Sequence, residues 1–433
     1  MARSRTFTTL SFRMSLIDPL PINPFTRPAK GTVVLPGSKS ITNRALILGA
    51  LGRETVTLQG ALFSRDSYLM VAALRALGFT VETDESSATI TISGRDGVIP
   101  KREASIDVGN AGNVARFVTA LVCLCDDGLF HFDGDAAMRE RPIGALLDAL
   151  SSQGAISNAR KFPFTLKTAG LPGGLVELDA SESSQMLSAL LMVGSHAQTP
   201  FRISLSKAPG SRPFVKMTER MIGQFEACPT TYDIEGDASA ASYFLSLPLV
   251  SGGSITLPNY GGSLQGDVKY SELLETIGLQ AGDPDEPPSY SAERGTKFMG
   301  IMQNFREFSD TFLSLAAIAP LLDGPTKITG IAHTRKQETD RVAGMARELR
   351  KLGQHVIEEE DSLEIHPRPL QSGQIIETYH DHRFAMSFAI LGCHDLHGDG
   401  RSWLSIKDPA CCAKTFPAFF EVLESVRQNS LHP

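Results

Sequence analysis

The sequence lacks any apolar run long enough to cross a membrane. A transmembrane helix needs about 20 consecutive apolar residues. The longest candidate, residues 114–125, is shorter and is interrupted by Arg116. With 42% hydrophobic and 21% charged residues, the composition is instead typical of a soluble globular protein. We therefore expect no membrane partner.

Cysteine is scarce as well. The six cysteines among 433 residues show no framework spacing, whereas disulfide scaffolds are short and dense in cysteine. Reduced cysteines in the cytoplasm are the expected state. Residues 1–13, MARSRTFTTLSFR, are basic and lack acid, as at the start of a transit peptide. The stretch is very short for that purpose, so an upstream start or a disordered tail is favoured.

Common signatures of nucleotide, hydrolase and metal sites are missing. No G-x-S-x-G indicates a serine hydrolase, and no G-x-G-x-x-G opens a dinucleotide-binding unit. The segment from Gly31 to Lys39 does not fit the ATPase phosphate loop. Four histidines near a vicinal cysteine pair match no standard zinc spacing. These residues are His380, His382, His394, His397, Cys411 and Cys412. We expect neither a metal nor an organic cofactor.

A formal net charge of −7 argues against a protein that binds nucleic acid by neutralising phosphates. It does not exclude a basic pocket, and short motifs that suit anions are present. Residues 36–44, PGSKSITNR, place glycine and serine before a predicted helix, whose N–H groups and dipole favour an anion. Residues 109–112, GNAG, open the helix of Arg116. Taken singly, each motif is also explained as an ordinary helix cap or turn.

The length predicts two or three domains, and an internal repeat supports similar units. Four segments share an amphipathic helix, a glycine and then a β-like stretch, and the glycine fits a helix C-cap. Gly78 and Gly154 are 76 residues apart, and Gly278 and Gly353 are 75 apart. Helices alternate with short β runs throughout, which indicates an α/β architecture of compact modules.

Taken together, the motifs closely resemble the 5-enolpyruvylshikimate-3-phosphate synthase family of enolpyruvyl transferases. The resemblance covers nearly the whole chain, about residues 28–426, with eleven landmarks in order. They include LPGSKSITNRAL, GNAG, MRERPIGALLDAL, SSQMLSALLM, SDTFLSLA, QETDR, DHRFAMSFA and DPACCAKTFP. One landmark would be weak evidence, but their shared order is specific.

The resemblance implies an α/β fold of two similar domains, each built of three βαβαββ units in an inside-out barrel. The first domain would comprise residues 37–235. The second would comprise residues 236–433, joined by the N-terminal segment 1–36. The chain would cross between the domains twice, and the active site would lie in the cleft between them. The repeat spacing agrees with this arrangement.

The implied reaction moves the enolpyruvyl group of phosphoenolpyruvate to the 5-hydroxyl of shikimate 3-phosphate, through a tetrahedral intermediate and without a cofactor. We expect a monomer. Carried over position by position, the shikimate 3-phosphate ligands would be Lys39, Ser40, Arg44, Ser183, Ser184, Ser211, Asp310, His333 and Gln337. The phosphoenolpyruvate ligands would be Lys39, Gly112, Arg141, Gln185, Arg341, Arg383 and Lys414. The catalytic proton carriers would be Lys39, Asp310 and Glu338.

The chemistry explains why these residue types are needed. The 5-hydroxyl loses a proton as it attacks C2 of phosphoenolpyruvate, and C3 gains one, so a base and an acid are both required. The two substrates together carry about five or six negative charges near neutral pH. Several converging cations must offset that repulsion. Six basic residues of the motifs supply them: Lys39, Arg44, Arg141, Arg341, Arg383 and Lys414.

Three positions depart from the commonest family pattern, all on the acceptor side. His333 stands where asparagine is usual, Gln337 where lysine is usual, and Phe214 where tyrosine is usual. Lys336 is adjacent to Gln337, and we expect it to point elsewhere. The phosphoenolpyruvate positions all match.

Two other functions stay open at this point. One is an enolpyruvyl transferase with a different acceptor. The sister transferase acting on UDP-N-acetylglucosamine has a cysteine acid in the loop that corresponds to residues 131–141. Here that loop reads HFDGDAAMRER and has no cysteine. The other is a non-catalytic anion-binding paralogue, which should have lost its acid–base residues first. Asp310, Glu338 and Lys39 are all present.

Overall fold

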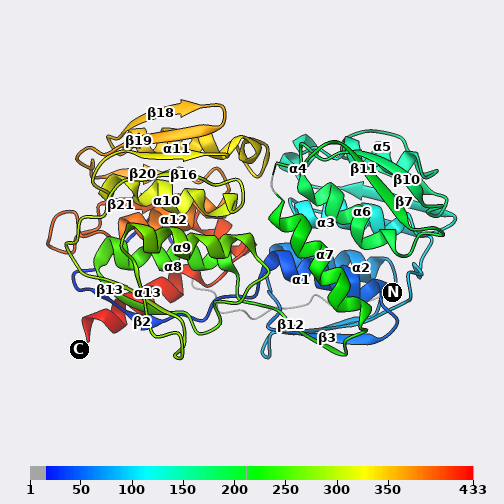
Figure 1. Cartoon of the computed structure of the whole chain (residues 1–433), viewed down its shortest axis with the longest axis horizontal. Coiled ribbons are helices and arrows are strands. Elements are labelled where there is room, and N and C mark those ends of the chain that lie inside the picture. Colours follow the sequence, from blue (N-terminus) through cyan, green and yellow to red (C-terminus); the bar gives the residue numbers. More distant parts are fainter. Residues whose placement is uncertain (1–15, 211, 433) are drawn as a thin grey trace, which may run out of the picture.

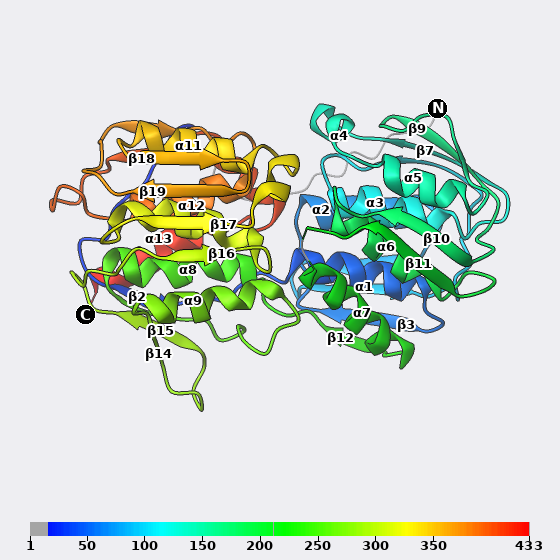
Figure 2. The same cartoon turned by 45° about the horizontal axis from the view of Figure 1, so that its top comes forward.

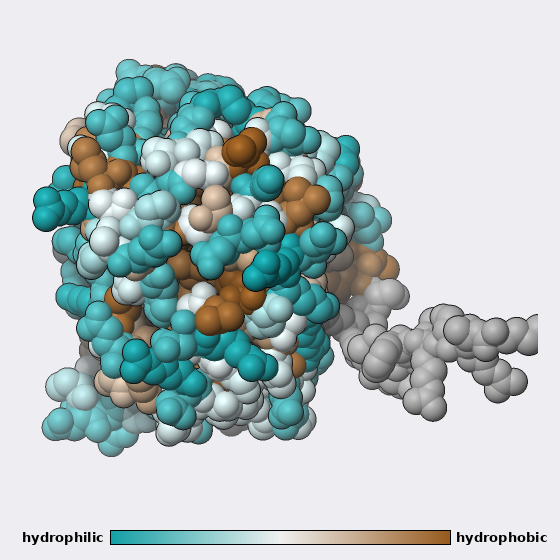
Figure 3. Space-filling model, turned by 90° about the vertical axis from the view of Figure 1, so that its right-hand side faces the viewer, coloured by the Kyte–Doolittle hydropathy of each residue, from teal (hydrophilic) through white to brown (hydrophobic). Residues whose placement is uncertain are grey.

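The computed structural model describes residues 16–210 and 212–432, so Ser211 and the segment 1–13 lie outside the described residues. Two lobes stand side by side along the longest axis (Figure 1). The surface at the end of the first lobe shows hydrophilic residues with smaller apolar areas between them (Figure 3). Buried apolar side chains form two separate clusters. One runs from Ile41 to Ile234 and defines the first lobe. The other combines residues 22–35 with residues 238–426 and defines the second lobe.

Three helices lie at the centre of the first lobe and pack against one another: α1 (Lys39–Leu51), α3 (Gly112–Val122) and α6 (Ser184–Gly194). Every residue of α3 is buried, and so is all of α1 after Ser40. Both helices are therefore covered on all sides by other parts of the lobe. Other helices lie outside this centre: α2 (Arg65–Ala76), α4 (Ala136–Glu140), α5 (Gly144–Ser151) and α7 (Pro213–Glu226).

The second lobe repeats this plan, as the turned view in Figure 2 shows. Its central helices are α8 (Ala238–Ser251), α10 (Phe312–Ile318) and α12 (His382–Gly392), which contact one another. Its outer helices are α9 (Lys269–Ile277), α11 (Arg341–Lys351) and α13 (Phe419–Leu431). Short 3-10 segments join these elements: η1 (Gly266–Val268), η2 (Ser309–Thr311), η3 (Ala319–Leu321), η4 (Ala332–Lys336) and η5 (Pro409–Lys414).

Small mixed sheets surround the central helices. In the first lobe the strands are β3 (Thr55–Gln59), β4 (Val81–Asp84), β5 (Thr89–Ser93), β6 (Glu103–Asp107), β7 (Gly128–Asp133), β8 (Ile156–Ser157), β9 (Phe164–Thr168), β10 (Gly174–Asp179), β11 (Phe201–Lys207) and β12 (Thr231–Asp233). In the second they are β1 (Leu20–Pro21), β2 (Ala29–Thr32), β13 (Gly253–Thr256), β14 (Gln280–Ala281), β15 (Ser289–Ala292), β16 (Met302–Asn304), β17 (Thr326–Thr329), β18 (His355–Glu359), β19 (Ser362–His366), β20 (Gln374–Ile376) and β21 (Leu404–Ile406).

The expected βαβαββ unit is present in both lobes. In the first, β6 and β7 pair in parallel around α3, and β8 and β9 close the sheet as an antiparallel hairpin. In the second, β16, β17, β18 and β19 repeat the pattern around α10. The unit of β10 and β11 differs from the expectation, because it is only a parallel pair among the described residues. After α7 the chain continues into β12, which joins the sheet of β3 and not the pair of β10 and β11.

The chain passes between the lobes twice. Strand β2 pairs in parallel with β13 of the second lobe, although the segment that follows it builds the first. Strand β12 is the last strand of the first lobe and pairs with β3, and the chain then enters α8 of the second lobe. The two crossings lie side by side, since Gly37 and Gly236 form an antiparallel bridge. A Cβ on Gly37 would lie 2.0 Å from the carbonyl oxygen of Gly60, so this crossing requires glycine.

The four predicted cap glycines are confirmed. Gly78, Gly154, Gly278 and Gly353 have φ values of 92°, 97°, 121° and 85°, which a side chain rarely adopts. All six cysteines are free. In the described parts of the chain, no helix has the length and apolarity to cross a membrane.

Candidate active site

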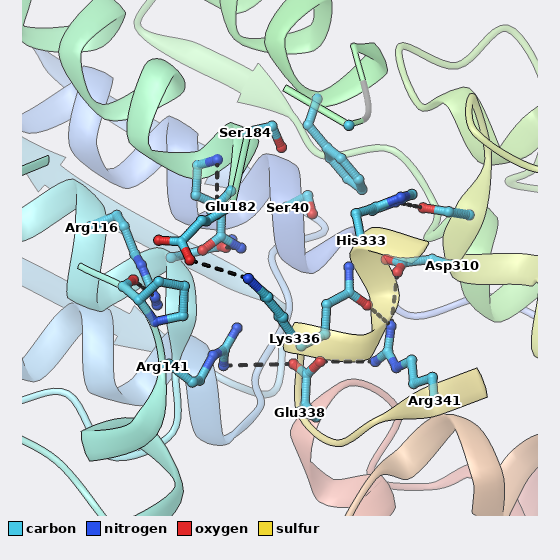
Figure 4. Close-up of a pocket in the computed structure, with 18 of the residues that line it drawn as sticks. Ser40, Arg116, Arg141, Glu182, Ser184, Asp310, His333, Lys336, Glu338 and Arg341 are labelled. Atoms are coloured by element: carbon cyan, nitrogen blue, oxygen red, sulfur yellow. Dashed lines mark hydrogen bonds and ion pairs between the residues drawn. The ribbon is translucent and has the colours of Figure 1, made fainter. Parts of the chain in front are cut away.

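The cleft between the lobes is lined by polar and charged side chains from both (Figure 4). The first lobe contributes Lys39, Ser40, Arg44, Asn113, Arg116, Arg141, Pro142, Ser181, Glu182, Ser183, Ser184, Gln185, Gly210 and Phe214. The second contributes Ser309, Asp310, His333, Lys336, Gln337, Glu338, Arg341, His382 and Arg383. Basic residues outnumber acidic ones in this lining, so the cleft suits anions.

Several central helices begin at this cleft. Helix α1 begins at Lys39, α6 at Ser184 and α12 at His382. In front of α10, the segment η2 carries Asp310. Each helix N-terminus presents backbone N–H groups and the positive end of the helix dipole. Anionic groups in the cleft would therefore be favoured even without the basic side chains.

Arg341 is the centre of the charged network in the second lobe. Its side chain is buried, with 1% of the residue exposed. Its Nε donates to Asp381 Oδ2 at 2.7 Å, Nη1 to Asp310 Oδ1 at 3.1 Å, and Nη2 to Glu338 Oε2 at 2.9 Å. Nη1 also donates to Oε1 of Gln337. One planar guanidinium thus fixes two cleft carboxylates, with Asp381 behind it.

Asp310 and Glu338 are both held in the ionised form. Burial alone would raise the pKa of Asp310, but Arg383 and Arg341 outweigh it and bring the pKa below its ordinary value. Arg383 Nη2 donates to Asp310 Oδ2 at 2.6 Å. For Glu338, burial also acts upward, yet Lys414 and Arg341 hold the pKa well below the ordinary value. Each carboxylate can therefore accept a proton at neutral pH.

Glu338 also lies where basic groups of the two lobes meet. Lys414, in η5 of the second lobe, donates to Glu338 Oε1 at 2.9 Å and to the carbonyl of Asn110 at 3.2 Å. Arg141 Nη1, from the first lobe, is 3.9 Å from the same Oε1. Lys39 Nζ is 3.5 Å from Asp66 Oδ2. An anion bound beside Glu338 would contact cations from both sides of the cleft.

Arg44 lines the cleft too, but it takes no part in these ion pairs. Its Nε donates to Thr218 Oγ1 at 2.7 Å, and Nη1 donates to the carbonyl of Ser40 at 2.9 Å. Its guanidinium carbon is 5.1 Å from the ring centre of Phe117. Among the described residues no carboxylate pairs with it, and burial lowers its pKa to about 9. Its charge is therefore uncompensated within the protein and favours an anion in the cleft.

The structure gathers nearly all of the predicted site residues in this cleft. Gly112 and Lys414 border it rather than line it. A Cβ on Gly112 would lie 2.7 Å from Arg141 Nη2 and 2.9 Å from Gln185 Oε1. Ser183 caps α6, because its hydroxyl accepts from the backbone N–H of Gln185 at 3.3 Å. Ser211 lies outside the described residues.

Sequence reasoning missed several residues that line the cleft. Arg116 is buried, and its Nη2 donates to the carbonyl of Pro142. His382 is buried beside Asp381, and desolvation holds its pKa well below the ordinary value. The expectation that Lys336 points elsewhere is wrong. It lines the cleft, and its Nζ lies 3.3 Å from Glu182 Oε1 (Figure 4).

Several buried polar atoms of the cleft lack a hydrogen-bond partner within residues 16–210 and 212–432. They include Asn113 Nδ2, Arg141 Nε, Gln185 Oε1 and Arg383 Nε. Buried polar groups are normally satisfied, so this set suits a polar ligand. In the same described ranges, no group of three or more His, Cys, Asp or Glu side chains is placed to hold a metal ion.

Comparison with known sequences points to one family. The model of a family described as EPSP synthase (3-phosphoshikimate 1-carboxyvinyltransferase) matches residues 25–228 and 226–423. A 3-phosphoshikimate 1-carboxyvinyltransferase of Opitutus terrae is 51% identical, over 96% of this chain and 100% of its own length. The chloroplastic one of Petunia hybrida is 37% identical, over 92% of this chain and 83% of its own length.

Solved structures support the same fold. An EPSP synthase from Acinetobacter baumannii matches with a TM-score of 0.76 at 24% identity, over 94% of this chain and 97% of that one. The enolpyruvyl transferase NikO from Streptomyces tendae matches with a TM-score of 0.68 at 15% identity, over 94% and 96% of the two chains. The expected two-domain α/β fold of enolpyruvyl transferases is thereby confirmed.

Proposed function

Because the chain belongs to the EPSP synthase (3-phosphoshikimate 1-carboxyvinyltransferase) family, we propose that the cleft between its lobes holds both substrates of that reaction. The protein transfers the enolpyruvyl group of phosphoenolpyruvate to the 5-hydroxyl of shikimate 3-phosphate and releases phosphate, a step of the shikimate pathway. The observation that carries the placement is that Arg341 donates hydrogen bonds to both Asp310 and Glu338. It sets two ionised carboxylates among the cations of one cleft.

Phosphoenolpyruvate lies, in this proposal, on the side of Glu338. The cations that meet there are Arg341, Arg383, Arg141, Lys414 and Lys39. They come from both lobes, so a small, highly charged anion between them would draw the lobes together. Gln185 and the backbone at Gly112 complete the subsite, since Gly112 leaves the space that Arg141 and Gln185 fill.

Shikimate 3-phosphate lies on the side of Arg44. Ser40, Ser183 and Ser184 offer hydroxyls beside the unpaired charge of Arg44. His333 faces them from the second lobe, with Nε2 2.8 Å from Ser309 Oγ. Burial lowers its pKa, so it is a neutral hydrogen-bonding group at neutral pH. Gln337 is neutral as well. The acceptor phosphate is therefore bound with few formal charges from the second lobe.

The proton transfers follow from the charge states. Asp310, whose pKa is lowered, takes the proton of the 5-hydroxyl as its oxygen bonds to C2 of phosphoenolpyruvate. Lys39, a cation at the cleft, supplies the proton that C3 gains in the tetrahedral adduct. When phosphate leaves, C3 loses a proton, and the ionised Glu338 is placed to accept it. No metal or organic cofactor is needed for these steps.

The proposal includes a monomer that works in the cytoplasm. Both lobes of the chain contribute side chains to the cleft, and all six cysteines are free. We also propose that residues 37–235 form the first domain and residues 236–433 the second, which the N-terminal segment 1–36 joins.

Two adjacent residues on α6 test the division into two subsites. Ser184→Ala should raise the KM for shikimate 3-phosphate about fivefold, which is the loss of one hydrogen bond, and leave the KM for phosphoenolpyruvate nearly unchanged. Gln185→Ala should raise the KM for phosphoenolpyruvate and leave the KM for shikimate 3-phosphate nearly unchanged. Steady-state kinetics with each substrate varied in turn measure both constants. If both variants moved the same constant, the two sides of the cleft would be assigned wrongly.

Gly112 bears on the herbicide glyphosate, which in this family occupies the phosphoenolpyruvate pocket. Gly112→Ala should raise the KM for phosphoenolpyruvate, because the new Cβ would push Arg141 and Gln185. Glyphosate is longer, so its inhibition constant should rise by a larger factor, which inhibition kinetics measure. Asn113 and Phe117 replace the threonine and proline that are common at these positions in the family, so the prediction concerns the difference between the two factors. Equal factors for substrate and inhibitor would show that Gly112 does not line the pocket.

A further inference from the structure

One ion pair spans the cleft beside the proposed acceptor subsite. Lys336 Nζ, at the end of η4 in the second lobe, is 3.3 Å from Glu182 Oε1 of the first lobe. Both side chains line the cleft and point toward each other across it (Figure 4). Glu182 directly precedes Ser183 and Ser184, and Lys336 directly precedes Gln337. Proposed acceptor ligands therefore flank the pair in both lobes.

The position of Glu182 is unfavourable for an anionic acceptor. A carboxylate next to two serines that bind a phosphate dianion repels that phosphate, and like charges at short range cost more than an exposed ion pair gains. Arg116 lies near enough for the charge of Glu182 to act on its pKa, but more weakly than burial and Arg141 do. Lys336 is the basic side chain in direct contact with Glu182.

The position of Lys336 is favourable for the same anion. Gln337 is neutral, and its Oε1 accepts from Arg341, so it brings no cation to the acceptor side. His333 is also neutral at neutral pH, because burial lowers its pKa. Lys336 is 64% exposed at its side chain, and its flexible stem can turn its charge from Glu182 to a nearby phosphate.

We propose that Lys336 and Glu182 together determine the affinity for the phosphate of the acceptor. Lys336 neutralises Glu182 in the free enzyme and offers its charge to the acceptor phosphate when that substrate binds. This inference rests on the proposed placement of shikimate 3-phosphate beside Ser183 and Ser184. It assigns a specificity role to two residues outside the set carried over from the family.

A double-mutant cycle tests the pair. Lys336→Met should raise the KM for shikimate 3-phosphate about tenfold, because it removes a cation and exposes the charge of Glu182. In the Glu182→Gln background the same change should cost only about twofold, since no carboxylate is exposed. Lys336→Arg should stay near the unmodified protein. The KM for phosphoenolpyruvate should change less than about twofold throughout.

The pair Lys407–Glu377 is a matched control. Its atoms are 2.7 Å apart with side chains 53% and 34% exposed, close to the 64% and 40% of Lys336 and Glu182, but neither residue lines the cleft. Lys407→Met and Glu377→Gln should change neither KM. Equal effects of Lys336→Met in both backgrounds, or equal shifts of both KM values, would overturn the inference. If the unmodified chain did not saturate with shikimate 3-phosphate, that result would instead contradict the proposed placement of this substrate, on which the inference rests.

Discussion

Asp310→Asn is expected to lower kcat by about a thousandfold, because it removes the base that takes the proton of the attacking hydroxyl. Asparagine has nearly the same shape, so Arg383 and Arg341, now 2.6 Å and 3.1 Å from the carboxylate, keep an oxygen to contact. The asparagine amide cannot, however, accept the proton of the attacking hydroxyl. Since the pKa of Asp310 lies below its ordinary value of 3.8, the carboxylate is a base at all neutral pH values. The defect should therefore persist from about pH 6 to pH 8.

Binding and a surface control separate lost chemistry from lost structure. Calorimetric titration should show that the Asp310→Asn protein binds shikimate 3-phosphate within about fivefold of the unmodified protein. Asp323→Asn changes an exposed carboxylate of the same lobe that does not line the cleft, and it should leave kcat unchanged. A loss below about tenfold for Asp310→Asn would assign the proton transfer to another group.

Arg341→Met is expected to give the largest loss of stability among cleft substitutions. It leaves Asp381, which is 0% exposed, and the cleft carboxylates Asp310 and Glu338 without their shared cation. Removing one partner of a buried ion pair costs about 3–5 kcal/mol. In a lobe of this size that corresponds to a fall in Tm of roughly 10 °C. Differential scanning calorimetry measures it.

Two companion variants make the result interpretable. Arg341→Met combined with Asp381→Asn should recover part of the lost Tm, because the most buried unpaired charge is gone. Lys407→Met breaks an exposed ion pair of the same lobe and should shift Tm by about 1–2 °C at most. A shift for Arg341→Met as small as that of Lys407→Met would show that the network contributes nothing to folding.

Local features of the fold were predictable where the sequence carries a local signal. The four cap glycines have the positive φ that their place after an apolar helical turn predicts. The central helices α1 and α3 are rich in apolar residues and are buried almost throughout, as the sequence pattern suggests. The parallel pairing of β2 with β13 and of β12 with β3 joins strands far apart in the chain. No local pattern encodes it, and only the resemblance to a family implied the two crossings.

The site was predictable to the level of residue types in motifs. Lys39, Arg141 and Arg341 could be named because they lie in the motifs that carry the family resemblance, and Lys39 and Arg341 are the first residues of α1 and α11. Which neighbours face the cleft could not be read from spacing. Arg116 lies in α3 and His382 in α12, and the face that each central helix turns to the cleft depends on its packing within its own lobe. Lys336 was misplaced because η4 ends there and its side chain reaches across to the other lobe.

The most direct test of the central claim is release of inorganic phosphate from phosphoenolpyruvate with two acceptors compared. The cleft gathers cations of both lobes around Asp310 and Glu338, and the segment 131–141 offers no cysteine acid. We therefore expect one phosphate released for each shikimate 3-phosphate converted, and none above background with UDP-N-acetylglucosamine. Release with UDP-N-acetylglucosamine, or none with shikimate 3-phosphate at saturating phosphoenolpyruvate, would contradict the account.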